Sequence, residues 1–250
     1  MGRDAAESIE AYAGRYGLGE LLSSELFEAL VPVRREPGEL LVRSGDQARQ
    51  LLFLVEGRAK AYTRLDNGQS VLASFFAPFD VLGELELFSS ERYALSVEAI
   101  ESALCLAIPV SLIKRSVDRN AKLLAFLCGR MGEKLADRVL AESINLRYTV
   151  EARFASYLVA SMDEDGGILG TDDLGEIADF IGASYRQLAR AVRRFRDDGL
   201  LERGRGRVRV ADRSRLEPLA GDLYLRGLGA REGPPRNPRR TRGGGDSLDA

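Results

Sequence analysis

The chain of 250 residues is 45% apolar and 30% charged with a net charge of −2, a composition typical of a globular protein of one or two domains. It contains no histidine, which removes the commonest acid–base group of enzymes and the usual ligand of zinc. Its apolar runs are too short to span a bilayer, and its first residues lack the apolar core of a secretion signal. We therefore expect a cytoplasmic protein that has no membrane partner and is not an enzyme.

The two cysteines, Cys105 and Cys128, each stand in an apolar stretch. Their number and spacing fit neither a metal site nor an iron–sulfur cluster, so we expect small core or interface residues. The sequence accordingly predicts no metal, haem or iron–sulfur cofactor.

The first part of the chain has the pattern of a β-rich domain. Residues 1–25 are expected to form a helical lead-in, and from 26 to 111 short apolar strands are separated by glycines. Asp66-Asn67-Gly68 indicates a hairpin, because Asn and Gly tolerate the positive φ that tight turns need. Many short strands with no long helix between them predict an antiparallel β-roll or jelly roll in an α+β protein.

A long helix is predicted over 112–147, where apolar residues recur every three or four positions. This stripe packs either on the roll of its own chain or in a two-stranded seam between two chains, and its length and narrowness favour the seam. Arg130 and Lys134 are expected on the opposite side of the helix. The residues assigned to the dimer interface are Leu124, Leu127, Cys128, Met131, Leu135 and Val139.

Residues 148–214 are typical of two helices joined by a short turn and followed by a hairpin. Thr171 can cap the first helix and Gly182 loosens the turn. Ser184 begins a capping box with Gln187, so a second helix is expected over 185–198. Its buried face consists of Leu188, Ala191, Val192 and Phe195.

The other face of this second helix is rich in hydrogen-bond donors, Arg186, Gln187, Arg190, Arg193 and Arg194, with Tyr185 in the first turn. Arginine can pair bidentately with guanine and glutamine with adenine in the major groove. A solvated basic helix balanced by acids elsewhere is the alternative, but only arginines are charged between 185 and 196. We therefore predict binding to double-stranded DNA through Ser184, Tyr185, Arg186, Gln187, Arg190 and Arg193, with Arg207 and Arg209 of a following wing near phosphates.

The chain beyond the wing, 215–250, is an extension that we expect to be disordered from about 227, because it is rich in Gly, Pro and Arg. A solvated tail is the favoured interpretation, and non-specific attraction of its arginines to DNA phosphates is the alternative.

The order of roll, long helix and winged helix-turn-helix resembles the Crp/Fnr family of bacterial transcription regulators over residues 26–214. The similar stretches are GELLVRSGD, LLFLVEGRAKAY, DVLGELELF and IADFIGASYRQLARAVRRFRDDGLL, and SVEAIESALCLAIP is similar to the YeiL-like branch. The resemblance implies a homodimer joined along the long helix, two recognition helices on a near-palindromic site, and contact with RNA polymerase. Ser184 and Arg190 match the family's recognition pattern, whereas Arg186 replaces a glutamate, so a different target sequence is expected.

The resemblance also identifies a candidate effector pocket. Cyclic-nucleotide-binding members have a Gly-Glu-Leu whose glutamate holds the ribose, followed by an arginine for the phosphate. Gly83, Glu84 and Leu85 match, but Tyr93 stands in the arginine's place and Arg92 lies one residue early. Either Arg92 turns inward and the protein is a cyclic-nucleotide receptor, or Tyr93 fills the pocket. We expect the second.

Two further differences from the family support this expectation. The hydroxyl residues that cyclic-AMP receptors present to adenine align with Arg138 and Val139, and the cysteine set of the oxygen-sensing members is absent. The roll is therefore expected to bind an unidentified small molecule or to have lost ligand control. A jelly-roll enzyme is a remote alternative, because such enzymes hold their metal with histidines.

Overall fold

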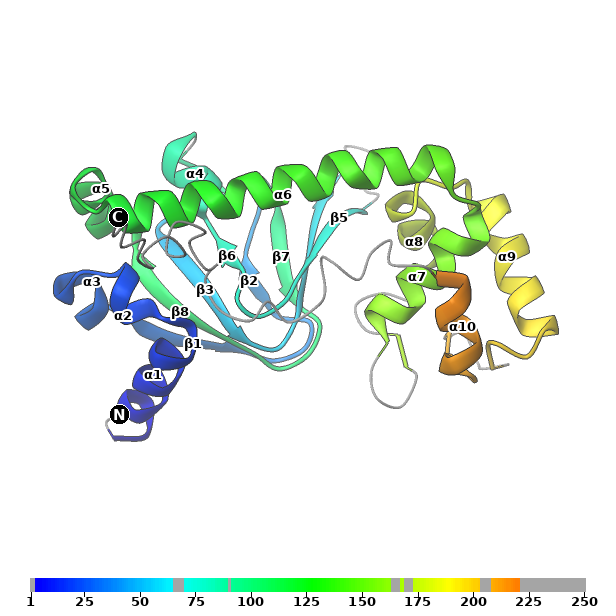
Figure 1. Ribbon diagram of the computed structural model, residues 1–250, viewed down its shortest axis with the longest axis horizontal. Helices are drawn as coiled ribbons and strands as arrows, with labels where there is room; N and C mark the ends of the chain where they lie inside the picture. The colour runs from blue at the N-terminus through cyan, green and yellow to red at the C-terminus, as the bar shows by residue number, and fades with distance from the viewer. Residues whose placement is uncertain are drawn as a thin grey trace, which may run out of the picture.

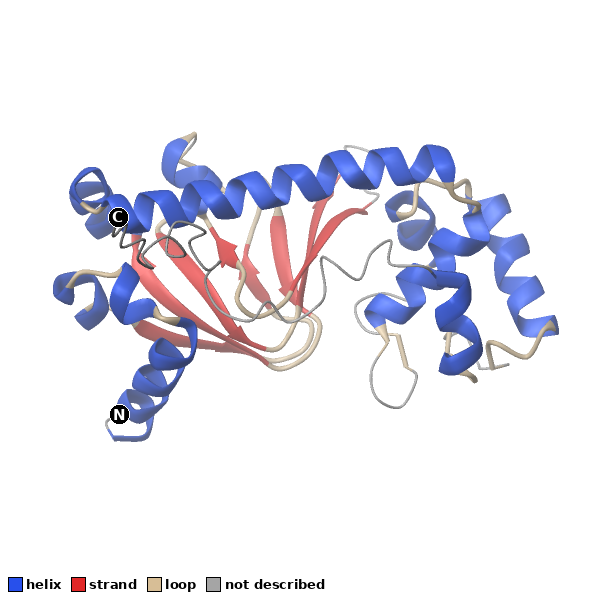
Figure 2. Ribbon diagram, viewed as in Figure 1, coloured by secondary structure: helices blue, strands red, loops and turns tan. Residues whose placement is uncertain are grey.

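The computed structural model describes residues 3–64, 70–89, 91–162, 167–168, 173–202 and 208–220. A β-roll with helices at one end is joined by the long helix α6 to a helical C-terminal domain (Figures 1 and 2). Among the described helices, none is both long and apolar enough to cross a bilayer.

The roll consists of two four-stranded antiparallel sheets, ordered β1-β8-β3-β6 and β2-β7-β4-β5. This is the antiparallel roll that the sequence predicted. The predicted hairpin turn at 66–68 lies outside the described residues. The strands are β1 Val31–Arg35, β2 Leu40–Val42, β3 Gln50–Glu56, β4 Ala59–Arg64, β5 Ser70–Phe76, β6 Val81–Leu82, β7 Ser96–Ala99 and β8 Ala103–Pro109.

The central residues of strands β3 and β8 are all apolar because the two faces of these strands belong to different cores. Leu54 and Cys105 are paired in register and point into the roll. Phe53 and Leu106, one position along, belong to a second core that the N-terminal helices and α6 cover. Successive side chains of a strand point to opposite faces, so both faces of these strands are buried.

The helices lie at the two ends of the molecule and along one side of the roll. The short helix α4 lies between β6 and β7, beside α6. The helices are α1 Arg3–Tyr16, α2 Leu18–Leu21, α3 Ser24–Glu28, α4 Glu84–Phe88, α5 Val110–Ser116, α6 Ala121–Arg147, α7 Val150–Ser161, α8 Leu174–Phe180, α9 Tyr185–Asp197 and α10 Arg213–Ala220, with a 3₁₀ turn at Val117–Arg119.

The helix predicted over 112–147 is interrupted in the structure. The separate helix α5 and a 3₁₀ turn precede α6, which begins only after Asn120. The Asn120 side chain accepts a hydrogen bond from the Leu123 amide at 3.1 Å and donates one to the Leu21 carbonyl at 2.8 Å. The Asn120 side chain thus caps α6 and is held by a contact 99 residues away in sequence. The spacing of apolar residues along the helix does not predict such a contact.

The C-terminal domain extends beyond the boundary expected at 214, because α10 packs on α7 with Leu216 and Ala220 buried. The domain is also docked on the roll through aromatic rings. Phe75 of β5 lies 5.9 Å from Tyr157 of α7 and 5.4 Å from Phe180 of α8, measured between ring centroids. This contact fixes α8 against the roll and leaves α9 at the far end of the molecule (Figure 1).

Candidate functional site

The helix α9 is held by local capping and by one buried face. Ser184 accepts a hydrogen bond from the Gln187 amide at 3.3 Å, and the Gln187 side chain accepts one from the Ser184 amide at 2.9 Å. Phe195 stacks on Phe154 of α7 with 5.5 Å between ring centroids. The capping box and the buried face are as the sequence predicted: Leu188, Ala191, Val192 and Phe195 are all buried.

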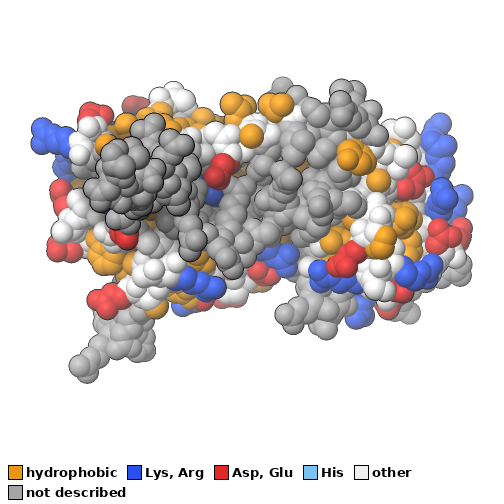
Figure 3. Space-filling view, in the orientation of Figure 1, with side chains coloured by type: hydrophobic (Ala, Val, Ile, Leu, Met, Phe, Trp, Pro, Cys, Tyr) orange, Lys and Arg blue, Asp and Glu red, His pale blue; other side chains and the backbone are white. Residues whose placement is uncertain are grey.

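The opposite face of α9 is exposed and basic. Arg186, Arg190 and Arg193 are exposed, and 61% of Tyr185 is accessible to solvent. Among the described residues, no acidic side chain forms an ion pair with Arg186 or Arg190. Basic side chains gather over this end of the molecule (Figure 3). This face therefore presents the donors that base edges and phosphates accept.

The side chain of Gln187 is already engaged in the cap, which limits what it can read. Its Oε1 accepts from both the amide and the hydroxyl of Ser184, each at 2.9 Å. A bidentate pair with adenine needs this oxygen as well as the amide nitrogen. Gln187 can donate to a base through its nitrogen, but it cannot form that pair without opening the cap.

The turn between α8 and α9 is tied to α7 by a buried arginine that the sequence did not single out. Gly182 has φ of +63°, which suits glycine, and the Ala183 amide donates to the Ala178 carbonyl at 2.8 Å. Arg153 is 6% exposed and donates to the carbonyls of Ile181 and Gly182, the latter at 3.0 Å. Arg153 thus satisfies the carbonyls at the end of α8 from the side of α7.

The start of α8 differs from the expected cap. Asp173, rather than Thr171, accepts from the amides of Gly175 and Glu176. Thr171 lies outside the described residues, as does Arg207 of the predicted wing. The other wing arginine, Arg209, is exposed and lies 3.7 Å from Glu202 in an ion pair.

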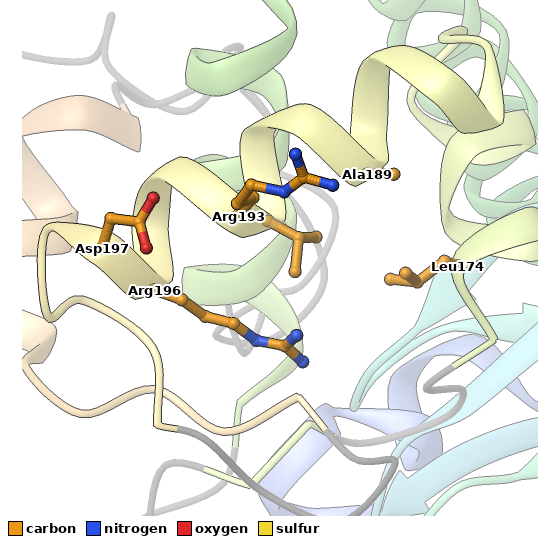
Figure 4. Close-up of a pocket in the computed structure, with 6 residues that line it drawn as sticks. Leu174, Ala189, Arg193, Arg196 and Asp197 are labelled. Atoms are coloured by element: carbon orange, nitrogen blue, oxygen red, sulfur yellow. The ribbon is translucent and has the colours of Figure 1, made fainter.

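One flank of α9 borders a hollow of about 360 Å³, lined by Leu174, Ala189, Val192, Arg193, Arg196 and Asp197. The side chains of Arg193 and Arg196 extend from the same flank of the helix, with Leu174 across the hollow (Figure 4). Arg196 was not among the predicted contacts, although its spacing of three from Arg193 places both on one flank. Both guanidinium groups add positive charge beside the recognition surface.

The long helix α6 has two apolar stripes where the sequence suggested one. The outer stripe consists of Leu124, Cys128, Met131, Leu135 and Val139; Cys128 is exposed, and Leu135 and Val139 are 66% and 57% exposed. Hydrophobic side chains are visible along this edge of the molecule, where Figure 1 places α6 (Figure 3). The inner stripe faces the roll: its apolar part is Leu123, Phe126 and Leu127, and the charged residues Arg130 and Lys134 continue it along the same side of the helix.

Leu127 was assigned to the dimer interface, and this assignment is wrong. It is fully buried in the core of its own chain, together with Phe126. Arg130 and Lys134, expected on the solvent side, also face the roll and pair with Asp80 and Glu84. Residues 127 and 128 are adjacent, so a spacing of three or four fits either stripe, and only packing distinguishes them.

The candidate effector pocket, which we call the cassette (83–93), is closed by residues of its own chain. Gly83 has φ of +92°, and a Cβ there would lie 2.7 Å from the Gln50 carbonyl oxygen. The Tyr93 hydroxyl donates to that same carbonyl at 2.8 Å, and the tyrosine is 8% exposed. Burial raises the pKa of Tyr93, so its hydroxyl remains a donor at neutral pH.

Glu84 and Arg92 of the cassette point to different partners. Glu84 is 4% exposed and pairs with the ammonium group of Lys134. Arg92 is exposed and donates from Nη1 to the Gly45 carbonyl at 2.7 Å. Leu85 is 51% exposed on the outside of α4. The structure therefore does not bring Arg92 and Glu84 together around one ligand position.

Two protein families match the chain over the roll and over the C-terminal domain. Residues 32–120 match the cyclic nucleotide-binding domain, and residues 152–219 match the Crp-like helix-turn-helix domain. The chain belongs to the Crp/Fnr family of transcription regulators. The second match contains Arg153 and the whole of α9, so this Crp/Fnr regulator binds DNA with the helix-turn-helix described above.

The chain is similar to curated relatives along most of its length and shares its fold with solved structures. The chain is 29% identical over 185 residues to the regulatory protein YeiL of Escherichia coli O157:H7, covering 74% of this chain and 83% of the relative. It is 24% identical over 225 residues to a CRP-like cAMP-activated global transcriptional regulator of Mycobacterium tuberculosis, covering 84% and 97%. A Crp/Fnr regulator from Eubacterium rectale has the same fold with a TM-score of 0.69, at 19% identity and with coverages of 82% and 98%.

Proposed function

We propose that this Crp/Fnr regulator acts in the cytoplasm as a homodimer, reads a near-palindromic DNA site with one α9 from each subunit, and contacts RNA polymerase there. The observation that carries the proposal is the capped helix α9, which exposes Arg186 and Arg190 beyond a buried face. A helix presented in this way can enter a major groove, and two copies related by a two-fold axis read inverted half-sites. Polymerase contact rests on family membership.

The outer stripe of α6 supports the dimer. Leu124, Cys128, Met131 and Leu135 are spaced by four, three and four residues, the alternation of the a and d positions of a two-stranded coiled coil. Within this stripe Leu124 is partly buried on the core of its own chain, whereas Leu135 and Val139 are exposed. Exposed large apolar side chains on a long helix favour burial against a second copy. In a parallel pair about a two-fold axis each Cys128 would lie close to the partner's own copy.

The cassette argues against cyclic AMP as the effector. A cyclic phosphate needs a cationic partner, and Arg92 instead donates to the Gly45 carbonyl on the outside of the roll. Tyr93, which stands in the place of the phosphate-binding arginine, is buried and bonded to Gln50. We therefore favour a regulator without cyclic-nucleotide control over the alternative that uses Glu84 and Arg92.

Selection of binding sites from random DNA by the purified full-length chain tests the proposal. We expect an enriched motif with inverted repeats, and a complex that contains two protein chains for each site by light scattering. Enrichment of an asymmetric motif by a monomer would contradict the homodimer. A selection that enriches no motif would contradict sequence-specific reading by α9.

A further inference from the structure

The cassette and the long helix are joined by two ion pairs with matched spacing. Asp80, three residues before the cassette, and Glu84, within it, are four residues apart, and Arg130 and Lys134 are four residues apart on the inner stripe of α6. Arg130 pairs with Asp80, and Lys134 pairs with Glu84. We call these four residues the ionic clamp.

We propose that the ionic clamp takes the place of an effector, so that specific DNA binding by this regulator requires no small molecule. The inference rests on the proposed function. It adds that the clamp, instead of a bound effector, keeps the regulator in the form that binds DNA. In this view Lys134 and Arg130 are positioning residues: they contact no DNA but fix α6, which leads into the DNA-binding domain.

The Arg130 side of the clamp is buried and its ion pair is hydrogen-bonded at both ends, although Arg130 Nε has no hydrogen-bond partner among the described residues. The exposed fractions of Arg130 and Asp80 are 3% and 4%. Arg130 also donates from Nη1 to Glu133 at 2.7 Å, and the second oxygen of Asp80 accepts from the Ala77 amide at 3.0 Å. Buried charges are stable only when paired and hydrogen-bonded, which makes this position of α6 strongly favoured over one that separates the pair.

The Lys134 side of the clamp occupies the position that a ligand hydroxyl would need. The ammonium group contacts the Glu84 carboxylate, lies 2.6 Å from the Val81 carbonyl oxygen, and stands 4.8 Å from the centre of the Phe76 ring. A ligand that binds Glu84 must therefore displace a charge-assisted hydrogen bond and a cation–π contact. The glutamate is already satisfied by its own chain.

The clamp can affect DNA binding because α6 includes the proposed seam between subunits and leads directly into the DNA-binding domain. These two parts of the helix determine how the two α9 helices are placed. Its outer stripe is the proposed seam between subunits, and its last residue, Arg147, is followed closely by α7 at Val150. The C-terminal domain is also docked on the roll through Phe75 and Phe180. Fixing α6 on the roll thus fixes the separation of the two α9 helices without a bound molecule.

The clamp could instead serve stability alone, and matched variants separate the two roles. Lys134→Met leaves Glu84 buried and unpaired, so it weakens the fold as well as the clamp. The double variant Glu84→Gln/Lys134→Met removes both charges and leaves no buried ion unpaired. The swapped variant Glu84→Lys/Lys134→Glu restores a pair of opposite charges. Lys122→Met, at an exposed position of the same helix, is the control.

The measurement is the affinity of full-length dimer for its selected site and for unrelated DNA, with and without 1 mM cyclic AMP or cyclic GMP. We expect the unmodified protein and Lys122→Met to bind the site equally well without additive, and neither nucleotide to change the affinity. The double neutral variant should keep its dimer and its affinity for unrelated DNA but lose about tenfold in specific affinity. The swapped variant should recover part of that loss, because it restores opposite charges but not the contacts of Lys134 with the Val81 carbonyl and the Phe76 ring.

Three outcomes are distinguishable. A tenfold or larger gain in specific affinity of the unmodified protein on adding either nucleotide would overturn the inference. So would a folded double neutral variant that binds the site as tightly as the unmodified protein. Absence of any preference of the unmodified protein for one DNA sequence over another would instead contradict the proposed function, whatever the clamp variants do.

Discussion

Arg92 and Tyr93 are neighbours in the chain but face opposite sides of the cassette. The Arg92 guanidinium donates to the Gly45 carbonyl at 2.7 Å on the surface, whereas the Tyr93 hydroxyl donates to the Gln50 carbonyl at 2.8 Å in the interior. Successive side chains of an extended segment alternate in direction. Because the arginine is shifted by one residue, its side chain lies outside the pocket, and the side chain of Tyr93 fills the pocket instead.

This relationship predicts the response of the cassette to substitution. Arg92→Ala should leave DNA affinity and thermal stability nearly unchanged, because it removes an exposed contact. Tyr93→Ala should lower the free energy of unfolding by about 3 kcal/mol, because it removes a buried ring. DNA-binding titrations and thermal unfolding measure these effects, and calorimetry with cyclic AMP tests whether the cassette binds the nucleotide. Micromolar binding of cyclic AMP that Arg92→Ala abolishes would show that the arginine turns inward.

Base reading by α9 predicts a contrast between two kinds of arginine. Arg186→Ala and Arg190→Ala should each lose about 1–3 kcal/mol of discrimination at particular base pairs. Arg209→Ala, in the wing, should weaken all sequences alike and reduce the salt dependence of binding by about one counterion. Competition assays with single-base variants of the site measure the difference. Equal losses on every sequence for all three variants would contradict base reading.

The two stripes of α6 predict different defects for two leucines that are eight residues apart. Leu135→Glu, on the outer stripe, should give folded monomers, because it places a charge in the proposed seam. Leu127→Ala, on the inner stripe, should lower the free energy of unfolding by about 2–5 kcal/mol. Light scattering and chemical denaturation separate the outcomes, with Lys122→Glu as an exposed control. A dimer that persists in Leu135→Glu would place the interface elsewhere.

Arg153 is predicted to position the recognition helix from behind. Arg153→Met leaves the Ile181 and Gly182 carbonyls without their donor, at a cost of about 1–3 kcal/mol in stability. The affinity for the selected site should fall further than the affinity for unrelated DNA. The orientation of α9 affects its contacts with base edges more than its contacts with phosphates. Arg213→Met, at an exposed position, is the control. Parallel losses on both kinds of DNA would indicate a purely structural role for Arg153.

Cys105 predicts a pH dependence of stability. Burial raises the pKa of its thiol from 9.0 to about 12. The folded state therefore keeps a proton that the unfolded chain releases, so this contribution to stability is complete below pH 9 and is lost as the pH rises toward 12. The slope should be about 1.4 kcal/mol per pH unit in that range. Denaturation of Cys105→Ala, compared with the unmodified protein between pH 8 and 11, should show a smaller decline. An equal decline of stability with pH in the two proteins would contradict the assignment of this pH dependence to Cys105.

The sequence was sufficient where local chemistry decides the structure. The capping box at Ser184 and Gln187 and the apolar spacing from Leu188 to Phe195 predict the position and the buried face of α9 from local residues. The alternating strands and glycines likewise identified the roll. Family resemblance then placed these parts in order.

The sequence did not show which residues of α6 face the roll and which face outward, because both faces of this helix carry apolar residues. Leu127 and Cys128 fit the same spacing, and only the packed core shows that the first is internal. Lys134 reads as a surface residue until Glu84, 50 positions earlier, is placed beside it. The break before α6 depends on a bond from Asn120 to Leu21. These are long-range contacts, and no local period encodes them.

A footprint of the full-length protein on its selected site tests the central claim most directly. Sequence-specific reading by two α9 helices predicts two protected half-sites with centres about 10 base pairs apart, related by an inverted repeat. Arg186→Ala should relax the base preference at the same position of both halves. A single protected half-site, or an Arg186→Ala protein with unchanged base preference, would contradict the account.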